Sequence, residues 1–68
     1  MKSDPDFLKT AIDEMTNLIM KNDNRYKKND ANKLSKCIAY GATIKGLTTK
    51  ELAKECDHLI YPNTKLPF

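Results

Sequence analysis

Apolar residues recur every three or four positions between residues 5 and 21, and this spacing predicts an amphipathic helix over 5–21. The apolar stripe of this helix consists of Phe7, Leu8, Ala11, Ile12, Met15, Leu18 and Ile19. Asp4 suits the N-cap, Pro5 suits the first helical position, and Asp6 adds negative charge to the first turn. The polar stretch KNDNRYKKND follows and predicts a loop, whose single aromatic residue, Tyr26, either folds back as a lid or is presented to a partner.

A second helix is predicted over residues 31–45, with Asp30 as its N-cap. Its apolar side carries Leu34, Cys37, Ile38, Gly41 and Ile44, with Tyr40 at the edge. Glycine costs about 1 kcal/mol relative to alanine inside a helix, so the position of Gly41 on the apolar side predicts the close approach of another helix. Gly46 marks the end of the second helix, because glycine is the usual residue at helix termini.

The stretch GLTTKELA, residues 46–53, carries a strong helix-start signal. Thr48 and Glu51 match the S/T-x-x-E capping box, in which each side chain accepts a hydrogen bond from the backbone of the other residue. Leu47 and Leu52 stand at the positions of a hydrophobic staple, in which two apolar side chains pack across the helix start. These features predict a third helix that begins at residue 49.

The third helix is expected to cover residues 49–60, because the residue before Pro62 is pushed away from helical backbone angles. Residues 61–68 then form an extended tail that contains two prolines. The tail is apolar enough to pack onto the helices or to bind in a groove of another protein. The apolar residues that favour this behaviour are Tyr61, Leu66 and Phe68.

Together these elements predict an all-α fold, a single three-helix bundle over residues 1–68 with an extended C-terminal tail. No run of alternating apolar and polar residues is long enough to predict a strand. Self-association into a homodimer is a further expectation, since a chain of 68 residues buries only a small core by itself. The predicted core consists of Leu8, Ile12, Met15, Ile19, Leu34, Ile38, Ile44, Leu52, Cys56 and Leu59.

Positive charge is concentrated in the middle of the chain, although the net charge of the whole is only +3. Residues 21–36 contain Lys21, Arg25, Lys27, Lys28, Lys33 and Lys36, against the acidic Asp23 and Asp30. Such a segment is typical either of a solvated loop or of a surface that binds a polyanion or an acidic protein. The chain has eleven lysines and one arginine, which disfavours base-specific DNA readout, because arginine makes the two-point contact to guanine.

The two cysteines, Cys37 and Cys56, are expected to be reduced thiols packed in the core. The first ten residues, MKSDPDFLKT, lack the apolar run of a secretory leader, and no stretch has the length of a membrane span. These features predict a soluble, cytoplasmic protein with free thiols. An oxidising setting would allow the two cysteines to form a disulfide, but no other feature of the sequence indicates such a setting.

No metal, cofactor or catalytic site is predicted. The cluster Cys56, Asp57 and His58 lacks the paired ligand spacing of zinc sites, even when Cys37 is added. His58 follows Cys56 by two residues, so on a helix their side chains point in different directions and do not form a nucleophile and its base. The short chain also offers little surface for a deep substrate cleft. The sequence therefore argues against an enzyme.

The second helix, the turn and the third helix resemble a helix-turn-helix, the DNA-binding motif. Gly46 matches the turn glycine, Leu47 the apolar residue after it, and Ala42 the small residue four positions before it. Leu52 matches an inward residue of the recognition helix. The sequence departs from the motif at positions that it usually fills with apolar residues, namely Gly41, Lys45 and Glu55.

The absence of a catalytic or cofactor motif favours a small regulatory or inhibitory protein that docks on a larger protein, like many short accessory proteins of bacteria, phages and plasmids. The residues expected to contact that partner are Tyr26, Tyr40, Tyr61, Phe68, Lys27 and Lys28. The alternative, implied by the helix-turn-helix resemblance, is a dimeric DNA-binding transcriptional regulator. The residues that this alternative assigns to DNA are Thr49, Lys50, Lys54 and Lys33.

Overall fold

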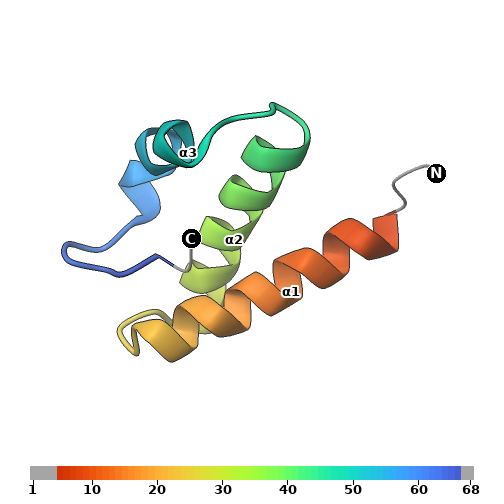
Figure 1. Cartoon of the computed structure of the whole chain (residues 1–68). Helices are drawn as coiled ribbons and strands as arrows, with labels where there is room; N and C mark the ends of the chain where they lie inside the picture. Colours follow the sequence, from red (N-terminus) through yellow and green to blue (C-terminus); the bar gives the residue numbers. More distant parts are fainter. Residues whose placement is uncertain (1–4, 67–68) are drawn as a thin grey trace.

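The computed structural model describes residues 5–66 and shows an all-α protein (Figure 1). The helices are α1 (Pro5–Asn22), α2 (Lys28–Thr43) and α3 (Thr49–Glu55), followed by a short 3-10 helix, η1 (Asp57–Leu59). Residues 5–66 contain no strand. The predicted fold class, an all-α bundle of three helices, is therefore confirmed, while the predicted N-cap Asp4 and the predicted anchor Phe68 lie outside the described residues.

The central element is α2, against which both α1 and α3 pack (Figure 1). No Cα atom of α1 lies within 8 Å of a Cα atom of α3 among the described residues. After η1 the chain returns toward the start of α2, and Tyr61 and Leu66 pack against the core. The prediction that the tail packs onto the helices is confirmed for these two residues.

The α1–α2 interface is built around small and hydroxyl side chains. Thr16 and Ser35 are both buried, and the Thr16 hydroxyl donates a hydrogen bond to Ser35 Oγ at 2.9 Å. The Ser35 hydroxyl donates to the Ala31 carbonyl at 2.9 Å, so the polar atoms of this contact are satisfied within the helices. Ala31 and Ser35 are fully buried, and their small size lets the two helices approach closely.

Most of the predicted core is confirmed. The buried members are Ile12, Ile19, Leu34, Ile38, Leu52 and Cys56. The half-buried members are Leu8, Met15 and Leu59. The assignment of Ile44 to the core is wrong, because Ile44 is the C-cap of α2 and is 71% exposed.

The start of α2 differs from the prediction. The helix begins at Lys28 with Lys27 at the N-cap, where no side chain caps it, so the prediction of Asp30 as N-cap is wrong. Asp30 instead lies in the first turn, and its carboxylate accepts a hydrogen bond from the Tyr61 hydroxyl at 3.1 Å. At the other end α2 stops at Thr43, slightly before the predicted boundary at residue 45.

The turn between α2 and α3 follows the sequence signals closely. Gly46 has a φ of +67°, which is the left-handed conformation that glycine favours, and the Leu47 N–H then donates to the Gly41 carbonyl at 2.9 Å. A Cβ atom added at Gly41 would lie 2.5 Å from Leu52 Cδ2. The predicted close approach at Gly41 is thus confirmed, with Leu52 of α3 as the neighbour.

The start of α3 is confirmed, but its end is not. Thr48 and Glu51 form both hydrogen bonds of the capping box, at 2.8 and 3.2 Å. The α-helix stops at Glu55 instead of residue 60, and η1 follows it with i to i+3 hydrogen bonds. The reason is tertiary, because the Leu59 carbonyl and the Tyr61 N–H bond to the hydroxyl of Tyr26.

Candidate functional site

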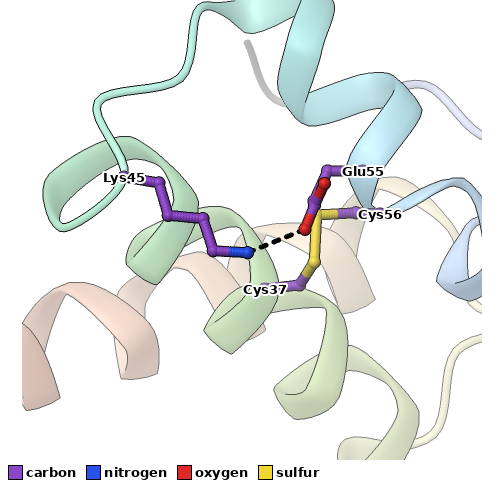
Figure 2. Close-up of a disulfide and its surroundings, with 4 residues drawn as sticks. All are labelled: Cys37, Lys45, Glu55 and Cys56. Carbon is purple, nitrogen blue, oxygen red and sulfur yellow. Dashed lines mark hydrogen bonds and ion pairs between the residues drawn. A yellow bond between two sulfur atoms is a disulfide. The ribbon is translucent and has the colours of Figure 1, made fainter.

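The two cysteines are joined in a disulfide that links α2 to the end of α3 (Figure 2). Their Cα atoms are 6.0 Å apart. The prediction of free, reduced thiols at Cys37 and Cys56 is therefore wrong. Cys37 lies on the side of α2 that α3 covers, and Cys56 caps the C-terminus of α3, so the packing of these two helices brings the sulfur atoms together.

Neither a cluster of metal ligands nor a membrane-spanning helix occurs within the described part of the chain. Residues 5–66 contain no group of three or more His, Cys, Asp or Glu side chains that could hold a metal ion. No helix in this part of the chain is both long enough and apolar enough to cross a membrane. His58 lies in η1 and is exposed.

Arg25, the only arginine of the chain, ties the α1–α2 loop to the tail. Its guanidinium forms an ion pair with Asp23 at 2.6 Å and donates to the Pro62 carbonyl at 2.8 Å and to Thr64 Oγ1 at 3.1 Å. The Thr64 hydroxyl in turn donates to Asp23 at 2.8 Å. The hydrogen bonds from Arg25 hold the pKa of Asp23 well below its usual range. We name Asp23, Arg25, Pro62 and Thr64 the tail clasp.

Tyr26 lies beside the tail clasp and is only 3% exposed. Its hydroxyl donates to the Leu59 carbonyl at 3.1 Å and accepts from the Tyr61 N–H at 2.8 Å, and its ring stacks on that of Tyr61 at 4.3 Å. Of the two possibilities predicted for Tyr26, the structure shows that it folds back and is not exposed to a partner, because its ring and its hydroxyl are both used within the protein. Tyr61 is half-buried, and its hydrogen bond to Asp30 raises the pKa of the Tyr61 phenol.

The acidic and basic residues of 21–36 differ in their internal contacts. Both acidic residues of the segment are engaged, Asp23 with Arg25 and Asp30 with Tyr61. The lysines of the segment that lie at or after the start of α2 are exposed and form no ion pair within residues 5–66. These lysines are Lys27, Lys28, Lys33 and Lys36.

Tyr40 extends the same surface toward the end of α2. It is 41% exposed and stands seven residues after Lys33 and four after Lys36, a spacing that places the three on one side of a helix. We name Lys33, Lys36 and Tyr40 the lysine face, while the exposed Lys27 and Lys28 lie at the start of the same helix. The sequence predicted Tyr40, Lys27 and Lys28 as contacts to a protein partner and Lys33 as a contact to DNA. It assigned Lys36 to neither.

A shallow groove runs beside the lysine face, between α1 and α2. Its volume is about 420 Å³, and Lys36 and Tyr40 form its α2 wall together with Asn32. The α1 wall includes the apolar side chains of Leu8 and Ile12. The remaining lining residues, Lys9 and Asp13, are charged. The groove therefore combines apolar side chains of α1 with two lysines and one aspartate.

The surface of α3 has a different charge pattern. Thr49, Lys50 and Lys54 are exposed, as the DNA-binding alternative requires. A hollow of about 550 Å³ on this side is lined by Lys50, Glu51, Ala53, Lys54 and Asp57, so its two lysines face two acidic residues. With only seven residues, α3 also provides less than two turns of helix to enter a DNA groove.

No protein-family model, curated protein or solved structure matches this chain. Its function is therefore inferred from its own surface, where the lysines of the lysine face are exposed and form no ion pair within residues 5–66.

Proposed function

We propose that this chain is a small, non-enzymatic regulatory or inhibitory protein that docks through its lysine face on an acidic surface of a larger protein. The observation that carries the proposal is the set of exposed lysines without an internal ion pair, next to a half-exposed tyrosine. Unpaired charge of one sign speeds the encounter with a surface of opposite sign. An aromatic side chain beside such charges is a typical anchor of a protein interface.

The groove next to Tyr40 supports a protein partner. Leu8 and Ile12 on the α1 wall suit an apolar side chain of a partner, while Lys36 on the α2 wall suits a carboxylate. Nucleic acid would use the lysines but gain little from these two apolar side chains. Both cysteines are consumed in the disulfide, so residues 5–66 hold no free thiol nucleophile, which supports a non-enzymatic role.

The accessory-protein origin and the cytoplasmic location stay predictions. The disulfide weighs against a compartment that is permanently reducing, because structural disulfides are rare there. Dimerisation likewise stays a prediction.

Two matched charge reversals test the proposal. Lys33→Glu/Lys36→Glu changes the lysine face and Lys50→Glu/Lys54→Glu changes α3, and each variant alters the net charge by the same amount. The tagged proteins are used to capture partners from nuclease-treated extract of the source cells. We expect a stoichiometric acidic protein with the wild type and the α3 variant, and at least a tenfold loss with the lysine-face variant.

The same variants test the DNA-binding alternative. Binding to duplex DNA is measured at two salt concentrations, and the proposal expects weak binding that disappears near physiological salt. Sequence-selective binding that survives physiological salt and is abolished by Lys50→Glu/Lys54→Glu would favour a helix-turn-helix regulator instead.

A further inference from the structure

The attachment of α3 to the rest of the protein depends on few contacts. Within α3 only Leu52 is buried, and among residues 5–66 no Cα atom of α3 lies within 8 Å of a Cα atom of α1. Two cross-links join its C-terminal end to α2 and the following turn, namely the disulfide and the ion pair between Lys45 Nζ and Glu55 Oε2 at 2.8 Å. Figure 2 shows these two cross-links side by side.

The contacts between α1 and α2 do not involve α3. The Thr16–Ser35 hydrogen bond joins α1 directly to α2, and both of these side chains are buried. The tail clasp joins the loop between these helices to residues that follow η1. The α1–α2 pair therefore keeps its own contacts if the disulfide opens.

The two cysteine residues differ in their exposure to solvent. Cys56 is 0% exposed, whereas Cys37 is only partly buried. Lys33 stands four residues before Cys37 and therefore on the same side of α2, while the Glu55 carboxylate beside the disulfide is paired with Lys45. A negatively charged thiol such as glutathione is attracted to this position.

We propose that the Cys37–Cys56 disulfide is a redox latch, which a small anionic thiol opens by attack at Cys37 and which then releases α3 from α2. The thiolate of glutathione attacks Cys37 Sγ, the bond between Cys37 and Cys56 breaks, and its electron pair leaves on Cys56 Sγ. A second glutathione thiolate attacks the glutathione sulfur on Cys37. The products are one molecule of glutathione disulfide and two cysteine thiolates, which take protons from water.

Burial of Cys56 couples this chemistry to movement of α3. The leaving thiolate forms at a position that is 0% exposed, and an anion there lacks hydration. Displacement of α3 lets Cys56 reach water and take up a proton. Cleavage of the disulfide and displacement of α3 are therefore coupled. The inference does not depend on the identity of the docking partner.

Hydrogen exchange of the oxidised and reduced protein tests the release of α3. A disulfide that closes a loop of this length, with a sequence separation of 19, restrains opening by about a hundredfold. We expect reduction to speed exchange of the Leu52 and Cys56 amides by about that factor, and exchange in α1 and the first half of α2 by less than about tenfold. Equal acceleration in all three helices, or none in α3, would overturn the proposal.

Trapping of the mixed disulfide tests the direction of attack. Oxidised protein is mixed with limiting glutathione, quenched with iodoacetamide and mapped by peptide mass. We expect glutathione on Cys37 and the alkyl group on Cys56, and the reverse labelling would refute the mechanism. A wild-type preparation purified without reductant that carries two free thiols would refute it at the first step.

A comparison of two thiols tests the role of charge. Glutathione is anionic and cysteamine is cationic, so the ratio of their reduction rates reports the local potential. The variant Lys33→Gln/Lys36→Gln should lower that ratio several-fold, whereas Lys50→Gln/Lys54→Gln should leave it close to the wild-type value. An unchanged ratio in the first variant would show that these lysines do not guide the thiol.

Discussion

The α1–α2 pair and the α3–tail half of this small protein are held together in different ways. Helices α1 and α2 have 18 and 16 residues, and they bury a continuous stripe of apolar and small side chains along their contact. The seven residues of α3 bury one side chain, and residues 60–66, which follow η1, contain no helix or strand. A long helix pair is stabilised by distributed packing, whereas a short helix and a tail need discrete bonds. The disulfide, the capping box, Tyr26 and the tail clasp supply them.

The largest expected effect comes from removal of the disulfide. Cys37→Ala/Cys56→Ala should lower the free energy of unfolding by about 3 kcal/mol and the melting temperature by more than about 10 °C. Urea denaturation with and without reductant measures the effect. Reductant should destabilise the wild type to a similar degree and leave the variant unchanged. A variant as stable as the oxidised wild type would show that α3 does not need the cross-link.

The next effect concerns the tyrosine under the tail. Tyr26→Phe keeps the ring but removes the hydroxyl, which leaves the Leu59 carbonyl and the Tyr61 N–H without their partner. We expect a loss of about 2 kcal/mol in the free energy of unfolding. Tyr40→Phe is the matched control, because Tyr40 is exposed and should tolerate the change within about 0.5 kcal/mol. Equal effects of the two substitutions would contradict the structural role of Tyr26.

A smaller effect is expected at the start of α3. Thr48→Ala removes the side chain that caps the Glu51 N–H and should cost about 1 kcal/mol. Thr49→Ala, one position later and exposed, should change stability by less than about 0.5 kcal/mol. The urea midpoint of each variant measures its change in stability. An unchanged midpoint for Thr48→Ala would mean that the capping box does not stabilise α3.

The smallest effect is a change in pH dependence at the tail clasp. The pKa of Asp23 lies below its value in the unfolded chain, because Arg25 bonds to the carboxylate. As the pH falls below about 4, the unfolded chain takes up a proton first, so the stability that Asp23 provides at neutral pH is lost in acid. Asp23→Asn should flatten the fall in the urea midpoint between about pH 4 and pH 2. Asp13→Asn, at an exposed position of α1, should keep the wild-type slope, and a flattening there would contradict the assignment to Asp23.

Local signals in the sequence predicted the fold well. The apolar spacing of α1, the capping box and the glycines at positions 41 and 46 each act within a few residues, so their consequences are readable from the chain. The length of α3 was not readable. The residues after Glu55 have an apolar spacing that continues the helix, but their backbone groups bond to a tyrosine more than 30 positions away in the sequence.

The candidate site was predictable only in part. The basic composition of residues 21–36 pointed to the lysines, and Tyr40 was identified as an aromatic anchor. The sequence could not show that Arg25 pairs with Asp23 and that Tyr61 bonds to Asp30, whereas the exposed lysines of this segment on α2 form no ion pair within residues 5–66. The disulfide was missed for a similar reason, because two cysteines on separate apolar faces do not reveal whether the faces meet.

The only arginine of the chain, Arg25, lies in the tail clasp, so cleavage of the chain at this residue measures how often the clasp opens. An arginine-specific protease can cut this chain only after Arg25, and the folded clasp occupies that side chain with the Pro62 carbonyl and Thr64. Cleavage therefore requires the tail to undock. When opening is fast relative to cleavage, the digestion rate measures the population of undocked molecules, without any label or substitution.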